Sequence, residues 1–461
     1  MFKSQTYINR RKQLKTDIKT GLILIPGNEE SPMNFADNTY NFRQDSSFLY
    51  FFALDYPGLT GVIDIDNDKD YIFGNDLTID DIVWMGTQAS LKERSEKAGI
   101  ENARTTSQLS DFLNDAKQKG RKIHFLPQYR ADNKIKFFNW LKINPNNVND
   151  FTSPELIQSV VNQRNIKTDE EIVEIEKAVN ITVDMHLAAM RMTKPGISEA
   201  EVAAVIQQVA QANQGELSFP TIASIHGETL HNHYHGNMLK KGDMLLVDAG
   251  AENKMHYAGD MSSTIPVDNK FTTRQREIYN IALDAHMAAV NALKPGVKFK
   301  DIHILACKTI AQGMKNMGFM KGDIDEAVAQ GAHAMFFPCG LGHMMGLDVH
   351  DMENLGEVYV GYDGKPKSTQ FGIKSLRLAR ELQTGFVLTI EPGIYFIPEL
   401  IDKWRAEKKF MDFLNYDKLN EYKNFGGLRN EEDYLITKDG ARLLGKPLPK
   451  TIKDVENEKT K

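Results

Sequence analysis

The sequence predicts an α/β protein with two domains, the second of which is built from two related halves. Short apolar runs alternate with helical patterns in the first third of the chain. Further on, a helix-like segment occurs twice, and a strand-like segment occurs twice with an acidic residue at the same position. The length of 461 residues also exceeds what one hydrophobic core usually serves.

The first domain is expected to span residues 1–165. Apolar runs at 22–25, 61–65 and 123–126 are bounded by Gly, Pro and Asp, which is typical of strands in a mixed α/β domain. The polar residues 66–69 separate two apolar runs and predict a hairpin turn. No group of residues with catalytic spacing occurs in this part of the chain.

The second domain is expected to span residues 166–450. Thr168 and Glu171 form a capping-box pattern, and apolar residues then recur at steps of three and four, which predicts a long amphipathic helix. In this domain, residues 181–196 match residues 281–296 in Ile, Asp, His, Ala-Ala and Lys-Pro-Gly, at an offset of 100 (281 − 181). This repeat predicts two related half-domains.

The strand repeat carries the carboxylates. Residues 242–250 and 385–393 share Gly, Leu, Val or Ile, an acidic residue and Gly in register, so Asp248 and Glu391 hold equivalent positions. A pseudo-twofold axis would bring these two groups face to face. The last residues, 451–461, are rich in Lys and Glu and are expected to form a polar tail that is solvated or disordered.

Composition excludes several classes of protein. A net charge of −6 and a pI near 6.1 argue against binding to nucleic acid or to an anionic membrane, and favour small molecules or proteins as partners. The two cysteines, Cys307 and Cys339, are too few for a disulfide framework. No apolar run reaches about 20 residues, and we expect a cytoplasmic location.

The candidate functional residues are acidic residues and histidines. Four carboxylates and an imidazole form an oxygen-rich set, and the negative charge of the carboxylates would balance two divalent cations. A second histidine, His350, lies seven residues after His343. Such ligands favour Mn²⁺, with Zn²⁺ and Co²⁺ left open, and two ions about 3.5–4 Å apart can activate water and polarise a carbonyl. The set comprises Asp248, Asp260, His343, Glu391 and Glu431.

The order and context of these residues resemble the pita-bread metallopeptidases, and among them the Xaa-Pro aminopeptidases and Xaa-Pro dipeptidases. Residues 43–48 also resemble the creatinase/aminopeptidase-P N-terminal domain. The resemblance implies a creatinase-like α/β domain followed by a pseudo-twofold pita-bread catalytic domain. The motifs that carry it are Val247-Asp248-Ala249-Gly250, Asp260 with Ser262 and Thr264, Gly342-His343, residues 346–351, Glu391-Pro392-Gly393, and Arg429 with Glu431.

The resemblance implies a dinuclear metal-dependent peptidase that hydrolyses the bond between an N-terminal residue and proline. In such an enzyme Asp248 and Asp260 would bind one ion, and His343 and Glu391 would bind the other. Asp260 and Glu431 would bridge the two ions. Glu391 would also help to move the proton of the attacking water.

Further residues are expected at the substrate. His350 and an upstream histidine would bind the substrate and stabilise the tetrahedral oxyanion. His231 matches the Leu-His context of the family, while His233 offers a competing alignment. Arg377 lies in a segment that resembles the dipeptidases, where it would bind the free carboxylate of a dipeptide; the alternative is a surface ion pair. Arg429 is also expected among the substrate-binding residues.

Several alternatives remain open at this point. Arg377 favours dipeptides, but longer proline-containing peptides are also compatible with the motifs. A non-catalytic pita-bread module that binds peptides or proteins is the alternative function, and such domains lack the ligand set that this chain retains. A homodimer is expected from the resemblance alone.

Overall fold

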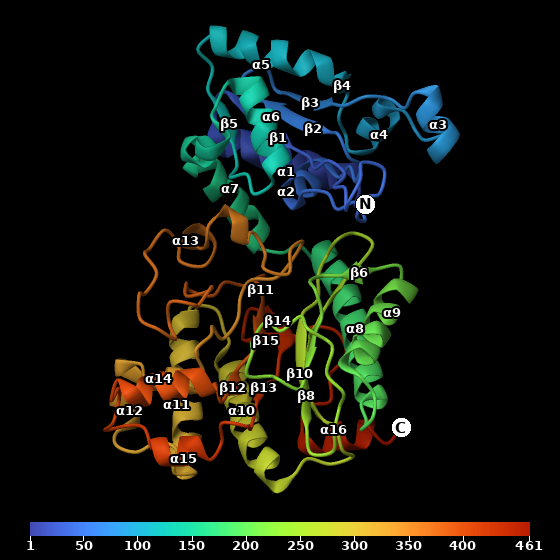
Figure 1. Ribbon diagram of the computed structural model, residues 1–461. Coiled ribbons are helices and arrows are strands. Elements are labelled where there is room, and N and C mark those ends of the chain that lie inside the picture. Colours follow the sequence, from blue (N-terminus) through green and yellow to red (C-terminus); the bar gives the residue numbers. More distant parts are fainter. The chain divides into compact units, whose positions relative to one another are not determined.

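The computed structural model describes residues 1–461 and divides into two compact units. One unit comprises Met1–Arg164 together with Asn354–Tyr359, and the other comprises Asn165–Glu353 together with Val360–Lys461. Figure 1 draws most of the first unit in blue to teal and most of the second in green to red.

The first unit is built on one mixed five-stranded sheet with strand order β4-β3-β2-β1-β5. β1 pairs with β2 and β2 with β3 in antiparallel fashion, while β3–β4 and β1–β5 are parallel. The three predicted strands and the predicted hairpin turn are therefore confirmed. In chain order the elements are α1 (Ser4–Ile18), β1 (Leu22–Pro26), α2 (Ser46–Phe52), β2 (Thr60–Asp64), β3 (Lys69–Phe73), α3 (Ile79–Met85), α4 (Leu91–Lys97), β4 (Asn102–Arg104), η1 (Thr106–Gln108), α5 (Leu109–Gln118), β5 (Ile123–Phe125), α6 (Ala131–Leu141), η2 (Pro145–Phe151) and α7 (Pro154–Asn165).

A buried arginine connects the helices of this unit to its sheet. Arg11 of α1 is fully buried and donates to the carboxylate of Asp70 on β3 at 2.7 Å. It also donates to the carbonyl of Phe51 at 2.7 Å and to those of Ala98 and Gly99 at 3.1 Å. Burial lowers the pKa of Arg11, and the charge of Asp70 partly offsets that fall. One guanidinium thus satisfies acceptors from three segments of the chain.

We expect Arg11→Ala to destabilise the first unit by about 3–5 kcal/mol, because the substitution leaves buried acceptors without a donor. Urea-dependent hydrogen exchange of the α1 amides measures this loss. Lys92→Ala is the control, since Lys92 Nζ lies 3.9 Å from the exposed Glu96 and such pairs contribute at most about 1 kcal/mol. Equal losses in the two variants would contradict the assigned role of Arg11.

The second unit contains two three-stranded sheets, β10-β8-β7 and β11-β14-β15, and two smaller ones. The elements of its first half are α8 (Asp169–Met192), α9 (Glu199–Ala212), β6 (Glu216–Leu217), β7 (Ile222–Ser224), β8 (Met244–Ala249), β9 (Ala251–Glu252) and β10 (Met261–Pro266). The later elements are α10 (Thr273–Ala292), α11 (Phe299–Asn316), α12 (Ile324–Gln330), η3 (Ala332–Met335), β11 (Val387–Ile390), β12 (Gly393–Tyr395), α14 (Pro398–Ala406), α15 (Tyr416–Asn420), β13 (Gly427–Arg429), β14 (Glu432–Ile436), β15 (Ala441–Leu443) and α16 (Ile452–Glu458). The short helices η4 (Glu353–Leu355) and α13 (Glu357–Val360), between η3 and β11 in the chain, belong mostly to the first unit.

The predicted duplication is visible in matching backbone hydrogen bonds. In each half, backbone hydrogen bonds connect the turn that follows the long helix to the segment that precedes the central strand. Gly196 and Gly296 both take positive φ angles in these turns, +92° and +85°, which explains the repeated Lys-Pro-Gly. The bonds are Gly196 N–H to Leu239 O (2.9 Å) and Leu239 N–H to Ile197 O (2.8 Å) in the first half, and Gly296 N–H to Leu382 O (2.9 Å) and Leu382 N–H to Val297 O (2.9 Å) in the second.

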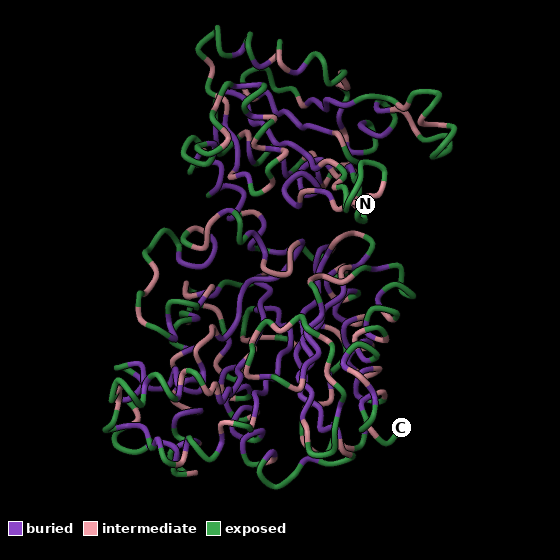
Figure 2. The backbone as a smooth tube through the Cα atoms, in the orientation of Figure 1, coloured by how far each residue is buried: buried purple, intermediate pink, exposed green.

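The central strands of the two halves are buried along their whole length, as Figure 2 shows in purple. β8 pairs with β10 and β11 pairs with β14, both in antiparallel fashion. An isolated bridge between Ser262 and Glu431 joins one half to the other. The pair α8 and α9 lies on one side of these strands and the pair α10 and α11 on the other (Figure 1). The strand ends therefore meet in the middle of the unit.

Part of the predicted tail, residues 451–461, is a helix that packs on the second unit, although most of its polar side chains are exposed. Residues 452–458 form α16, which Thr451 caps by accepting from the Asp454 N–H at 3.1 Å. Val455 is fully buried, and Glu458 accepts from Arg191 at 2.8 Å. The helix forms because distant residues of the same unit supply its partners, although its own sequence has few apolar residues. None of the helices combines the length and the apolar composition needed to cross a membrane.

Candidate metal centre

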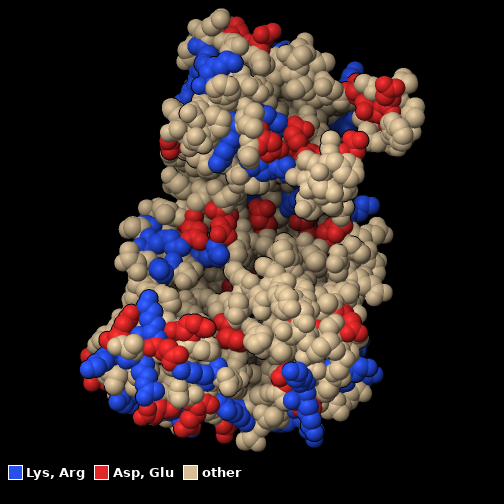
Figure 3. Space-filling view, viewed as in Figure 1, with Lys and Arg blue, Asp and Glu red and all other residues tan.

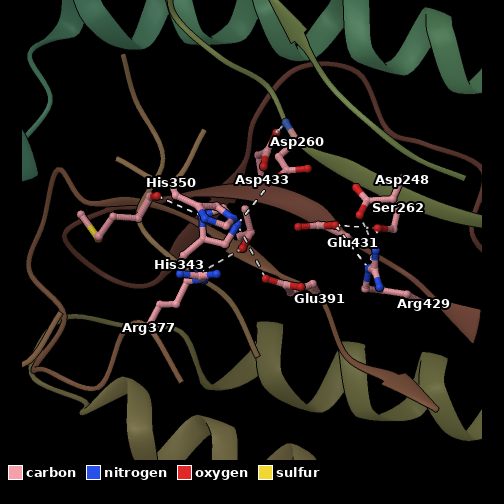
Figure 4. Close-up of polar contacts among 12 residues, drawn as sticks. Asp248, Asp260, Ser262, His343, His350, Arg377, Glu391, Arg429, Glu431 and Asp433 are labelled. Carbon is pink, nitrogen blue, oxygen red and sulfur yellow. Dashed lines mark hydrogen bonds and ion pairs between the residues drawn. The ribbon is translucent and has the colours of Figure 1, made fainter. Parts of the chain in front are cut away.

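Four carboxylates of the second unit surround one space. Asp248 is on β8, Asp260 directly precedes β10, Glu391 directly follows β11, and Glu431 directly precedes β14. Their side chains turn toward a common space that the ring of His343 borders (Figure 4). Ligand atoms of Asp248, Asp260 and Glu431 lie within 4.8 Å of one another, and so do those of His343, Glu391 and Glu431. The structure thus brings together the five residues predicted as metal ligands.

The backbone around His343 is fixed by Thr389 of β11. The His343 N–H donates to Thr389 Oγ1 at 3.1 Å, and the Thr389 N–H donates to His343 O at 3.0 Å. A Cβ on Gly342 would stand 2.1 Å from the carbonyl oxygen of Thr389, so this close approach requires glycine. The glycine directly before the histidine therefore has a structural cause.

The His343 ring presents a lone pair to two carboxylates. Its Nδ1–H donates to the carbonyl of Met344 at 3.0 Å, which leaves Nε2 without a proton. Nε2 lies 3.3 Å from Asp260 Oδ2 and 3.7 Å from Glu391 Oε1. A lone pair and two carboxylate oxygens cannot bond to one another, whereas a cation between them would be bound by all three.

Two further observations fit divalent cations at this site. Asp260 Oδ1 is buried and accepts no hydrogen bond, which is rare for a buried carboxylate. Burial raises the pKa of Asp260 and Glu431 well above the ordinary range, and the neighbouring carboxylates raise it further. The pKa of Glu391 is also raised, first by burial. The residues present therefore fit a pair of positive ions.

Arg429 offsets part of the negative charge. Its guanidinium donates to Asp248, to Ser262 Oγ at 2.8 Å and to the Tyr395 hydroxyl at 2.9 Å. Ser262 in turn donates to Glu431 Oε2 at 2.7 Å. Arg429 lines the pocket, but these contacts hold two predicted ligands in place. Its role in substrate binding remains a prediction.

Two residues of the site were not predicted from the sequence as site residues. Ser262 connects Arg429 to Glu431, and Asp433 accepts the backbone N–H of Asp260 at 3.1 Å. Both lie within or beside the motifs around Asp260 and Glu431, but nothing in their spacing distinguishes them from ordinary strand residues. Only the pairing of segments about 170 residues apart reveals their role.

His350 and Arg377 lie beside the cluster and share one partner, Glu353. The rings of His343 and His350 are 4.1 Å apart between centroids. His350 Nδ1–H donates to Glu353 Oε2 at 2.6 Å, and Arg377 forms an ion pair with Glu353 Oε1. Burial lowers the pKa of His350 to about 4, so its ring is neutral at pH 7. Arg377 thus makes the ion pair that the sequence left open as an alternative, at a partly exposed position.

Both candidate upstream histidines line the same pocket of about 300 Å³ as the acidic residues. Burial lowers the pKa of His231, and the charges of Arg429 and Arg377 lower it further while Asp248 raises it. His231 therefore lies within the electric field of the acidic cluster. Arg377 is outside the pocket lining, although its charge also acts on the pKa of His343 and His350.

The outer surface of the second unit gives no comparable concentration of charge in the view of Figure 3. Blue and red side chains are interspersed over the lower left of that face, near α12, α14 and α15.

Comparison with known proteins identifies the class of enzyme. Residues 173–438 match metallopeptidase family M24, and residues 7–124 match the N-terminal domain of aminopeptidase P. The chain belongs to metallopeptidase family M24. It is therefore a hydrolase, and the family implies divalent metal ions, which the buried carboxylates and the free lone pair of His343 fit.

Relatives of this M24 peptidase carry two kinds of name. This chain is 31% identical to the human Xaa-Pro dipeptidase over 448 residues, which cover 94% of this chain and 88% of the relative. It is 30% identical to a probable Xaa-Pro aminopeptidase of Pyrenophora tritici-repentis over 443 residues, covering 95% and 91%.

A solved structure confirms the predicted architecture. Aminopeptidase P from Escherichia coli with the inhibitor Pro-Leu superposes on the whole of this chain with a TM-score of 0.81 and 27% identity, and 98% of that protein is covered. A zinc-substituted form of the same protein in complex with product matches equally well. The α/β domain followed by the catalytic domain is thus the architecture of this M24 peptidase.

We expect Ser262→Ala to weaken Mn²⁺ binding by roughly 10–100-fold, because it removes the link between Arg429 and Glu431. Isothermal titration with Mn²⁺ measures the affinity. Ser263→Ala is the control, since Ser263 points to the other face of β10 and its Oγ lies 2.7 Å from His186 Nδ1. That variant should lose stability but keep its affinity for Mn²⁺; equal affinities in both variants would disprove the role of Ser262.

Proposed function

We propose that this M24 peptidase hydrolyses the bond between an N-terminal residue and proline, using two divalent ions. The observation that carries the proposal is the buried cluster in which His343 Nε2 faces Asp260 and Glu391 with a free lone pair. The names of the relatives support the substrate class, since each names an Xaa-Pro peptidase.

The apolar part of the pocket supports proline as the residue after the cleaved bond. Proline has an apolar ring, a fixed φ and a tertiary amide without an N–H. A pocket for it therefore needs apolar surface and no acceptor for an amide proton. The apolar residues that line the pocket are Phe219, Pro220, Ile222, Leu230 and Val349.

The proposed ligands are the five predicted from the sequence. Asp248 and Asp260 would bind one ion, His343 and Glu391 the other, and Asp260 and Glu431 would bridge them. Hard oxygen donors with one imidazole and no thiolate favour Mn²⁺. When bound, the ions would polarise the scissile carbonyl and lower the pKa of the attacking water.

The protein's own groups move the proton and bind the oxyanion. Glu391 would accept the proton of the attacking water and pass it to the proline nitrogen as the bond breaks. His231 and His350 would bind the substrate and donate to the tetrahedral oxyanion. Since His350 gives its Nδ1–H to Glu353, its Nε2 donates only when the ring is protonated, which the oxyanion and Glu353 both favour.

We expect Asp260→Ala to lower Mn²⁺-dependent release of the N-terminal residue from an Xaa-Pro substrate by at least about 100-fold, because it removes a ligand of both ions. Steady-state assay of the purified chain measures this loss. Asp284→Ala, on an exposed position of α10, should keep the wild-type rate. An undiminished rate in Asp260→Ala would sink the proposed function.

The proposal includes a preference for dipeptides. A bidentate contact between a guanidinium and the free C-terminal carboxylate would measure peptide length. Two observations support Arg377 in this role: its charge acts on the pKa of His343 and His350, and the pocket is at the small end of ligand sites. A substrate carboxylate would then replace or share the contact that Arg377 makes with Glu353.

We expect Arg377→Ala to lower kcat/KM for an Xaa-Pro dipeptide by roughly 10–100-fold and to leave an Xaa-Pro-Xaa tripeptide much less affected, since only the dipeptide has its carboxylate at this position. Comparing the two substrates in wild type and variant measures the difference. Arg442→Ala, which removes an exposed partner of Glu176, is the control. Equal losses on both substrates would remove the argument for dipeptides.

The cysteines and the family resemblance bear on where the protein is found and on its oligomeric state. Cys307 and Cys339 are both free, which suits a reducing compartment such as the cytoplasm. We propose a homodimer on the resemblance to the family, and light scattering of the purified chain tests it; the mass of a single chain would contradict this part.

A further inference from the structure

A second group of metal-binding side chains lies outside the carboxylate cluster. His303 and Cys307 are on α11 and His333 is on η3, and all three are fully buried. One ligand atom from each lies within 4.8 Å of the others. None of the three is used by the proposed peptidase chemistry.

The spacing of His303 and Cys307 matches that of two ligands on a tetrahedral metal ion. His303 and Cys307 are four residues apart on a helix, so their side chains share one face. Cys307 Sγ and His303 Nε2 are hydrogen-bonded at 3.5 Å, a separation that two ligands of one metal ion would also have. Bonds of about 2.0 Å to nitrogen and about 2.3 Å to sulfur at a tetrahedral angle place the two atoms about 3.5 Å apart.

The hydrogen bonding of the triad is incomplete. His303 Nδ1 is buried and has no hydrogen-bond partner, and the buried ring of His333 has only a poorly aligned contact with the carbonyl of Val328. Such atoms are uncommon in folded proteins. His303 packs against the ring of Phe337, 5.5 Å between centroids, and a Cβ on Gly372 would approach His333 Nε2 to 3.2 Å. The surroundings are therefore tightly packed and offer little to these nitrogens.

The protonation of the imidazoles suits metal binding. Burial lowers the pKa of His303 to about 3 and that of His333 to about 4, the carbonyl of Val328 partly offsetting the second fall. Both rings are thus neutral and carry a lone pair. Burial raises the pKa of the Cys307 thiol, so a cation nearby would be needed to stabilise its thiolate.

We infer that His303, Cys307 and His333 bind one Zn²⁺ ion that is separate from the catalytic pair. Thiolate and imidazole ligands select Zn²⁺, whereas the carboxylates of the other cluster suit harder ions, and the triad supplies three of the four ligands that Zn²⁺ usually takes. Because the triad is sealed, the ion is acquired during folding. It ties η3 to α11 just before the segment that leads to His343. This inference does not depend on the proposed substrate.

Cobalt substitution tests the site, because only a cysteine ligand gives a thiolate-to-cobalt charge-transfer band in the near ultraviolet. Protein is produced in minimal medium with Co²⁺ in place of Zn²⁺. We expect the band in the wild type and in Asp260→Ala, which damages the carboxylate site only. Cys307→Ser should lose it, while Cys339→Ser, which removes the other cysteine, should keep it. No band in the wild type, or a band that survives Cys307→Ser, would overturn the inference.

X-ray absorption by the wild-type protein is a second test, and it does not depend on whether Cys307→Ser folds. Wild-type protein produced with Zn²⁺ and dialysed against a chelator should retain one Zn²⁺ per chain with one sulfur and two imidazole nitrogens among its ligands. A retained ion with oxygen and nitrogen ligands only, or no retained ion, would overturn the inference. Peptidase activity is not the readout, so a wrong substrate assignment leaves both experiments valid.

Discussion

The repulsion among four neighbouring carboxylates, three of them buried, is the constraint on which the second unit depends. Asp248, Asp260 and Glu431 are buried and Glu391 is partly buried, so the four groups lie close together where water screens them poorly. Arg429 pairs directly with Asp248, and the pKa of three of the four is raised. Divalent cations would remove this repulsion, which is why stability and peptidase activity are expected to depend on the same ions.

The duplicated backbone makes this arrangement possible. Two central strands with the same hydrogen-bonded entry deliver Asp248 and Glu391 from opposite halves, and their antiparallel partners bring Asp260 and Glu431 to the same place. Because all these residues lie on or directly beside fully buried strands, the positions of the carboxylates are set by the sheets. The loop residues His343 and His350 then need only local support, from Thr389 and Glu353 respectively.

The sequence predicted the features that depend on local or repeated patterns. It did not predict the features that depend on contacts between residues far apart in the chain. Strands, the hairpin, the duplicated turns and the order of the five proposed ligands follow from short patterns. α16 was missed because its stability comes from partners such as Arg191, far away in the chain. Ser262 and Asp433 were missed for the same reason. The Leu-His context favours His231, but His231 and His233 are two residues apart in a loop and both line the pocket.

The central claim is that the carboxylate cluster binds two ions. The most direct measurement is anomalous X-ray scattering from a crystal of the Mn²⁺-loaded protein. We expect two neighbouring peaks, with Asp260 and Glu431 in contact with both, Asp248 with one and His343 and Glu391 with the other. The absence of a peak among these residues at saturating Mn²⁺ would contradict the account.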